Sequence, residues 1–226
     1  MSITAKLSEK RGLQARMGGH LAIPALFTSG EGVDSIVRIV SDAAEKPEAQ
    51  PTATGESAIS LGRYCHVPGK NAMAVNYDNL VEGTYGFAAN HRNIIGANAS
   101  AAATFGARNE IYAPYGFTAG RLNKVLEGAT EGLVAGLQNV LKVPYGARFG
   151  QWCDEQSDAL FAIGNGDRPS NRKDAFAVFM DGSMALNGEK FTSTELRSTI
   201  NAIGDIKTAL DEIIAIQEAL IGGASA

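Results

Sequence analysis

A repeat of about 14 residues runs through the middle of the chain and limits the folds that the chain can adopt. Each copy opens on a five-residue frame in which small and apolar residues alternate before a closing glycine or asparagine. This period is too short for two-helix repeats, which need about 33 residues, and glycine weakens helix interiors. Alternation at period 2 instead predicts short strands. The frames start at residues 58, 72, 86, 102, 116, 132 and 146.

Two further columns of residues keep the register of the frames. Fourteen extended residues at about 3.3 Å each suit one flattened coil of two short strands, and coils stacked about 4.8 Å apart would pair in parallel. Matching residues then lie above one another, so asparagines can form a ladder of side-chain hydrogen bonds. The ladder column, seven residues after each start, holds Asn79, Asn93, Asn109, Asn123 and Asn139, with Cys65 and Cys153 at its ends. The core column, nine residues after each start, holds Val67, Val81, Ile95, Ile111 and Val125.

The frame also predicts an oligomer. Its second and fourth places exchange volume from coil to coil, as in Phe87 with Ala89 and Ala103 with Phe105, which is typical of interdigitated packing in a thin core. The small residues at the first and third places would then meet another chain closely. A single stack has a weak core, whereas ordering the backbone costs about 1–2 kcal/mol per residue. We therefore expect an obligate oligomer of parallel β-roll or β-helix coils.

The segments outside the repeat predict further units. Two apolar runs, LFAIG and AFAVFM, flank a polar stretch and predict a β-hairpin junction. A helix is expected from about residue 192, with Thr192 or Ser193 as its cap and Glu195 in its first turn. Heptad spacing predicts that this helix forms a coiled coil through Leu196, Ile200, Ile203, Leu210 and Ile214. The expected units are an N-terminal anchor or cap (1–45), a linker (46–55), the β-roll repeats (56–156), the hairpin junction (157–190) and the coiled-coil helix (191–226).

Composition argues against several classes of function. A formal net charge of −4 and a pI of about 5.4 argue against a general nucleic-acid binder, because nucleic acids attract basic surfaces. No apolar run reaches the roughly 18 residues that span a bilayer, and the N-terminal stretch lacks the features of a signal peptide. With 45% hydrophobic and 19% charged residues, the chain is not a disordered polyelectrolyte. We expect neither a nucleic-acid nor a membrane partner.

The sequence also predicts a protein without catalytic or metal chemistry. His66 and His91 fall in different columns and His20 lies apart, so no stack of metal ligands forms. EF-hand, HExxH and GxSxG patterns are absent from the sequence, and the carboxylates do not cluster. Cys65 and Cys153 stand at opposite ends of the repeat, too far apart for a disulfide within one chain, and are expected to be buried thiols. We therefore expect no enzyme activity, no metal and no cofactor.

Aromatic and arginine side chains near the turns are the remaining candidates for contacts. Tyrosine and tryptophan suit carbohydrate or protein surfaces, and packing between chains is the alternative role. The candidate receptor contacts are Tyr64, Tyr77, Tyr115 and Trp152, and Tyr85, Tyr112 and Tyr145 also border turns. Arginines near the turns are expected to bond across chains: Arg63, Arg92, Arg108, Arg121 and Arg148.

Three segments resemble known fibrous proteins. The 14-residue frame resembles the head repeats of trimeric adhesins, which form a left-handed parallel β-roll trimer. The segment ALFAIGNGDRPSNRKDAFAVFMDGSMALNG, residues 159–188, looks like the junction upstream of the tip in phage and prophage tail fibres. The terminal ALDEIIAIQEALIGG, residues 209–223, looks like the C-terminal helix of baseplate-associated or fibre proteins.

The resemblance implies a mainly β homotrimeric fibre. Its expected function is structural, in host-surface attachment or in decoration of a capsid or tail. The expected partners are a larger virion assembly, held through the N-terminal region, and a host-surface glycan or protein. A bacterial trimeric surface adhesin, located on the cell surface, is the alternative. The sequence shows no secretion signal and no membrane-anchoring C-terminal strands, which favours a location on the virion.

Overall fold

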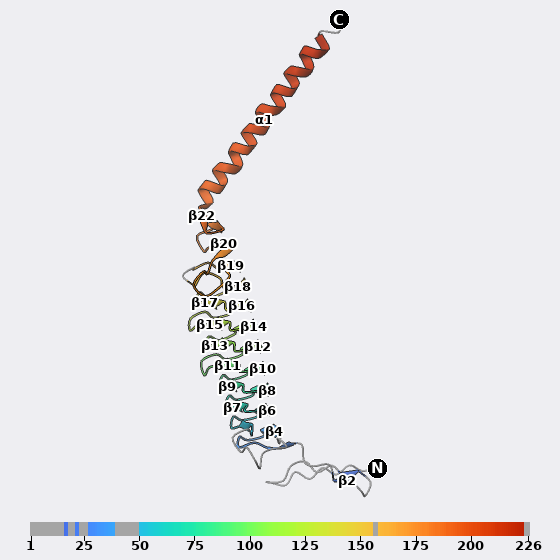
Figure 1. The fold of residues 1–226 in the computed structure, drawn as a ribbon, viewed down its shortest axis with the longest axis vertical. Coiled ribbons are helices and arrows are strands. Elements are labelled where there is room, and N and C mark those ends of the chain that lie inside the picture. The colour runs from blue at the N-terminus through green and yellow to red at the C-terminus, as the bar shows by residue number, and fades with distance from the viewer. Residues whose placement is uncertain (1–15, 18–20, 23–26, 39–49, 156–157, 224–226) are drawn as a thin grey trace.

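The computed structural model describes residues 16–17, 21–22, 27–38, 50–155 and 158–223. These residues form an elongated molecule in which a stack of β-coils is followed by one long helix (Figure 1). Helix α1 spans Ser193–Gly223 and extends away from the last strands of the stack (Figure 1). The predicted mainly β architecture with a C-terminal helix is therefore confirmed.

Each coil of the repeat contains one five-residue strand and one two-residue strand. The five-residue strands are β6 (Ile59–Arg63), β8 (Met73–Tyr77), β10 (Phe87–His91), β12 (Ala103–Ala107), β14 (Phe117–Arg121), β16 (Leu133–Leu137) and β18 (Ala147–Gln151). The two-residue strands are β5 (Thr52–Ala53), β7 (His66–Val67), β9 (Leu80–Val81), β11 (Ile94–Ile95), β13 (Glu110–Ile111), β15 (Lys124–Val125) and β17 (Val140–Leu141). The long strands pair in parallel in one sheet, and the short strands pair in parallel in a second sheet.

The coils stack in register, which confirms the predicted parallel β-solenoid. Ala88 of β10 pairs with Ala74 of β8 on one side and with Thr104 of β12 on the other, so the same place of each frame recurs along the sheet. Coils of 14 and 16 residues share this register. The longer coils take up their two extra residues in the turn after the short strand, as in residues 96–101 compared with residues 82–85.

The first and third places of the frame face the interior of the stack, whereas the second and fourth places were expected there. First-place Ala58 and Ala72 and third-place Ala74 and Ala88 are buried. The large apolar residues at the second and fourth places instead point outward, and the side chain of Phe105 is 40% exposed. The prediction that these pairs fill the core, and that the small residues face another chain, is wrong.

The physical reason is the narrow space inside a coil of two strands. A Cβ added at first-place Gly116 would lie 2.6 Å from Cγ2 of Ile111 in the core column, and one at Gly86 would lie 2.6 Å from Cγ1 of Val81. The branched side chains of the core column already fill the interior, so the frame must be small where it faces them. All five predicted core-column residues are fully buried.

The asparagine column forms a buried ladder in which each side chain joins its own coil to the next. The Asn109 side-chain amide donates to the carbonyls of Phe105 (3.0 Å) and Gly120 (3.1 Å), and its Oδ1 accepts the backbone N–H of Asn123 (3.0 Å). A bond between two side chains of the column, from Asn93 Nδ2 to Asn79 Oδ1, measures 3.1 Å. Most rungs therefore run from side chain to backbone, because stacking places the next coil's N–H directly at the amide oxygen.

The fifth place of the frame adopts the left-handed conformation that was expected of it. Asn90 has a φ of 84°, and Gly106 and Gly120 have φ values of 113° and 112°. A Cβ at Gly106 would collide with the carbonyl oxygen of Gly120 in the next coil. Glycine is required here by both the dihedral angle and the close approach of the coils.

The N-terminal residues within the described part of the chain extend the stack. Strand β3 (Phe27–Ser29) pairs antiparallel with β4 (Ile36–Arg38), β4 pairs in parallel with β6, and β5 pairs in parallel with β7. Residues 27–38 and 50–55 therefore build the first coil, and the stack begins before the expected boundary at residue 56. Two further strands, β1 (Arg16–Met17) and β2 (Leu21–Ala22), pair antiparallel. The first 15 residues, His20 and linker residues 46–49 lie outside the described residues.

The stack ends in antiparallel strands that lead to the helix. Strand β19 (Phe161–Asn165) continues the long-strand sheet in parallel, and β20 (Asp174–Val178), β21 (Met184–Leu186) and β22 (Glu189–Phe191) follow antiparallel. A capping box then starts α1: the Glu195 N–H donates to Thr192 Oγ1 (3.1 Å), and the Thr192 N–H donates to Glu195 Oε2 (2.7 Å). The bonds that the Glu195 carboxylate accepts from the N–H and the hydroxyl of Thr192 lower the pKa of Glu195.

We predict that Asn109→Leu lowers the thermal stability of the protein. The substitution removes the acceptor of the Asn123 N–H and the donor to two carbonyls, and a buried polar group without a partner costs about 1–3 kcal/mol. The free energy of unfolding should fall by about 3 kcal/mol or more, measured by denaturant unfolding. Asn98→Leu, at an exposed turn position, is the matched control. An unchanged melting temperature for Asn109→Leu would contradict a stabilising ladder.

Candidate functional site

The outer face of the long-strand sheet presents a continuous apolar surface. The second and fourth places of each frame lie on this face, and their side chains are half-buried or exposed. Phenylalanines contact one another from coil to coil, with ring centroids 5.4 Å apart for Phe87 and Phe105 and 5.8 Å apart for Phe105 and Phe117. We call this surface the outer stripe: Ile59, Leu61, Met73, Val75, Phe87, Ala89, Ala103, Phe105, Phe117, Ala119, Leu133, Ala135, Ala147, Phe149, Phe161 and Ile163.

Helix α1 exposes apolar side chains as well. The heptad residues Ile200, Ile203, Leu210 and Ile214 are all exposed, as are Ile206 and Ile213 beside them. In a single chain, an apolar face of a helix in water is unfavourable. The helix and the outer stripe thus present the same kind of surface in consecutive parts of one rod.

Two of the four predicted receptor contacts lie together at one turn of the coils. The Tyr64 and Tyr77 rings pack edge to face with centroids 5.4 Å apart, and His91 follows at 5.3 Å from Tyr77. An ion pair between Arg92 and Asp78, 2.9 Å long, lies beside them. This cluster is a partly exposed aromatic surface, with Tyr64 and His91 half-buried, and it has one charged pair at its border.

The other two predicted contacts lie elsewhere. Trp152 shares the turn column of Tyr64 but stands at the far end of the repeat, with its side chain half-buried. Tyr115 lies at the opposite turn, two residues before the start of β14. The structure therefore does not gather Tyr64, Tyr77, Tyr115 and Trp152 into one site.

Tyr115 belongs to a column of three exposed tyrosines that the sequence analysis did not identify as a group. Tyr85, Tyr115 and Tyr145 each precede a frame, with side chains 62%, 61% and 69% exposed. Each ends a four-residue turn, whereas the intervening six-residue turns end in Ala101 and Glu131. Their constant spacing of 30 residues, one short and one long coil, was the signal that would have found them.

A buried polar group closes the C-terminal end of the repeat. Arg148 occupies a third place of the frame, is fully buried, and donates from Nη1 to the carbonyl of Ala159 (2.9 Å). Burial lowers the pKa of Arg148, and the nearby carboxylate of buried Asp174 opposes that shift. Asp174 also accepts the backbone N–H of Asp154 (3.0 Å). The expectation that Arg148 bonds to another chain is wrong, because its guanidinium lies inside its own coil.

Both cysteines are free and buried at the two ends of the asparagine ladder. The Cys153 N–H donates to Asn139 Oδ1 (3.0 Å), and its thiol donates to the carbonyl of Phe149 (3.2 Å). Burial raises the pKa of Cys65, and burial with the adjacent Asp174 carboxylate raises the pKa of Cys153 to about 11. A thiol that stays protonated is a poor nucleophile.

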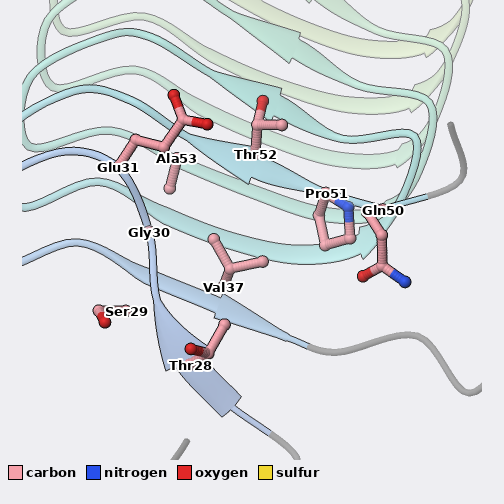
Figure 2. Close-up of a pocket in the computed structure, with 9 residues that line it drawn as sticks. All are labelled: Thr28, Ser29, Gly30, Glu31, Val37, Gln50, Pro51, Thr52 and Ala53. Atoms are coloured by element: carbon pink, nitrogen blue, oxygen red, sulfur yellow. The ribbon is translucent and has the colours of Figure 1, made fainter. Parts of the chain in front are cut away.

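A cavity of about 580 Å³ opens at the N-terminal end of the stack. Figure 2 shows it between strands β3 and β4 on one side and the segment that contains β5 on the other. Its lining residues contain one carboxylate, that of Glu31, and neither histidine nor cysteine. These residues offer no pair of groups for acid–base or nucleophilic chemistry. The lining consists of Thr28, Ser29, Gly30, Glu31, Val37, Gln50, Pro51, Thr52 and Ala53.

The described part of the chain contains neither a cluster of metal-binding side chains nor a membrane-spanning helix. No three histidine, cysteine, aspartate or glutamate side chains gather there closely enough to hold a metal ion. His66 Nδ1 lies 2.8 Å from Thr52 Oγ1, and His91 belongs to the aromatic cluster. None of the described helices has both the length and the apolar character needed to cross a bilayer.

Comparison with known proteins gives no match to a family model, a curated protein or a solved structure.

We predict that neither thiol reacts while the protein is folded. At pH 8 the raised pKa values keep both groups protonated, and the coils cover them. Iodoacetamide should label Cys65 and Cys153 only after denaturation, as measured by intact-mass spectrometry, with the denatured chain as the positive control. Because the folded-state pKa of Cys153 is raised, its contribution to stability is complete below its unfolded pKa and is lost as the pH rises towards about 11. Rapid labelling of the native protein would contradict this burial.

Proposed function

We propose that the protein is a non-enzymatic, homotrimeric fibre of a virus particle that presents a repetitive surface to a host. The outer stripe is the observation that carries the proposal. A contiguous exposed apolar surface of this length marks an interaction site, since soluble monomers rarely present one. In the trimer, three outer stripes meet around an axis parallel to the stack.

A second copy of the same chain is the partner that fits the stripe best. Every coil offers a similar pair of apolar residues, so a copy aligned alongside meets the same pattern at every step. The stack also needs such a partner, because each coil contributes to its interior about one large core-column residue, such as Ile95 or Ile111, together with small frame residues. Burying the outer stripe adds apolar contact at about 25 cal/mol per Å².

The helix supports three chains rather than two. Its heptad residues form one seam, and exposed Ile206 and Ile213 widen the apolar face beside it. A single seam suits two helices, whereas a broader face suits three or more. The same number of chains then forms the coiled coil and the solenoid, which agrees with the resemblance to trimeric adhesin heads and phage fibre junctions.

The proposed mechanism of attachment is avidity. A rigid trimer presents three identical faces, and many trimers on one particle convert weak contacts into durable adsorption. The chain would join the particle through its N-terminal region and decorate a capsid or tail. The Tyr64–Tyr77–His91 cluster is one surface available for host contact in this arrangement.

We predict that Phe117→Asp and Leu210→Asp each disrupt the trimer. Each places a carboxylate in an apolar contact between chains, where no opposite charge compensates it. Sedimentation should show a trimer for the unmodified protein, and monomer or aggregate for the two variants. Asn98→Asp in an exposed turn and Thr208→Asp on the outer heptad position of α1 are controls that should remain trimeric. A monomeric unmodified protein would overturn the trimer.

We predict that the protein is located on virus particles. Antibody raised against the protein should label purified particles in immunogold electron microscopy, at the end of a fibre or on the capsid surface. Particles from a strain that lacks the gene are the control. Label on the bacterial cell envelope with unlabelled particles would assign the protein to a surface adhesin and overturn the virion location.

A further inference from the structure

The three exposed tyrosines form a straight row along the stack, which we call the tyrosine ridge (Tyr85, Tyr115 and Tyr145). The N–H of Tyr115 donates to the carbonyl of Ser100 (2.9 Å), and the N–H of Ala101 donates to the carbonyl of Thr84 (2.8 Å). Each of these bonds advances the column by one coil. Consecutive tyrosines are therefore two coils apart, about 9.6 Å at the usual spacing of paired strands.

The ridge carries bulky residues where the fold itself does not favour them. The three tyrosines have φ values of 57–58°, in the left-handed region that disfavours bulky side chains. Other coils have Asn71, Ala101 and Glu131 at the same place, with φ values of 53°, 52° and 58°. The tyrosine rings gain little from burial, since more than 60% of each side chain is exposed. A conformational penalty without compensating packing points to a role in binding.

The spacing and surroundings of the rings fit a polysaccharide chain. Sugar rings have an apolar C–H face that packs on aromatic rings, and in an extended β-1,4-linked chain each disaccharide advances nearly the distance between two ridge tyrosines. Every second sugar would then turn the same face to a ring. The carbonyls of Ser100 and Thr130 accept the N–H groups of Tyr115 and Tyr145 (both 2.9 Å), and Thr84 directly precedes Tyr85. These three residues carry hydroxyl groups, which can form hydrogen bonds with sugar hydroxyls.

We propose that the tyrosine ridge binds an extended β-1,4-linked glycan that runs parallel to the fibre axis. The proposal deepens the attachment function and rests on it for its biological setting. The ridge lies at a turn, whereas the proposed contacts between chains lie on the outer face of the long strands. The three rings of one ridge are therefore free to bind one glycan chain in each subunit.

The test is calorimetric titration of the purified full-length protein with chitohexaose and with cellohexaose. A hexasaccharide covers all three rings and a disaccharide covers one, so at least one hexasaccharide should bind at least about tenfold more tightly than its own disaccharide. Maltohexaose, whose α-1,4-linked chain coils, should not bind. If neither β-linked hexasaccharide binds, or if the disaccharide binds as tightly, the proposal is overturned.

Variants of the ridge identify the site. Tyr115→Ser removes the central ring and should weaken hexasaccharide binding by about tenfold, and the triple variant Tyr85→Ser, Tyr115→Ser, Tyr145→Ser should abolish it. Leu122→Ser, an apolar residue with a φ of 58° at the opposite turn, is the matched control and should bind normally. Unchanged binding by the triple variant would overturn the ridge as the site.

Sedimentation of the same samples separates this proposal from the proposed function. If the triple variant loses the trimer that the unmodified protein forms, the tyrosines pack between chains and the glycan proposal is overturned. If the unmodified protein is a monomer that still binds through the ridge, the fibre proposal fails and the glycan site stands. If the unmodified protein is a trimer that binds neither glycan, the fibre proposal stands and the glycan site at the tyrosine ridge is overturned.

Discussion

The in-register stacking of coils is the constraint on which the rest of the structure depends. Parallel strands of consecutive coils share their backbone hydrogen bonds, so each residue meets the residue at the same place of the next coil. A property that recurs in the sequence thereby becomes a column in space. The buried asparagine ladder, the left-handed glycines and the tyrosine ridge are all columns of this kind. A shift of one coil by a single residue would turn its buried face to solvent and break every column at once.

The sequence was sufficient to predict the coil and its register, but it could not tell which face is inside. Asparagine and branched apolar residues at fixed offsets predicted the parallel stack. Alternation at period 2 defines two faces of the frame, and both contain residues that can be buried. The choice depends on what lies opposite: Val81 already fills the space against first-place Gly86. This three-dimensional contact is between a short strand and the start of the next frame, and it has no signature within the frame alone.

The aromatic surfaces and the position of Arg148 were less predictable from the sequence than the coil, because they too depend on which residues become neighbours in space. Tyr64 and Tyr77 are 13 positions apart, not the 14 of the coil, and their contact follows from adjacent positions in the turn. Tyr85 and Tyr145 become partners of Tyr115 only when short and long coils are counted together. Arg148 sits in the third place of a frame and looked like a turn residue, whereas the end of the stack provides buried Asp174 beside it.

The repetitive surface creates a problem of alignment that the C-terminal part of the chain is suited to solve. In the proposed trimer, three outer stripes that repeat from coil to coil could slide past one another by two coils and recover similar contacts. The antiparallel strands β20 to β22 do not repeat, so a slide would leave them unmatched. In the proposed coiled coil, helix α1 adds a second condition. Its heptad seam is interrupted by Lys207, and displacement by one heptad would place this charge level with Ile200 or Ile214. In the proposed trimer, the non-repeating elements after the repeat would therefore fix the axial register of the chains, as specificity elements must when the main contact is degenerate.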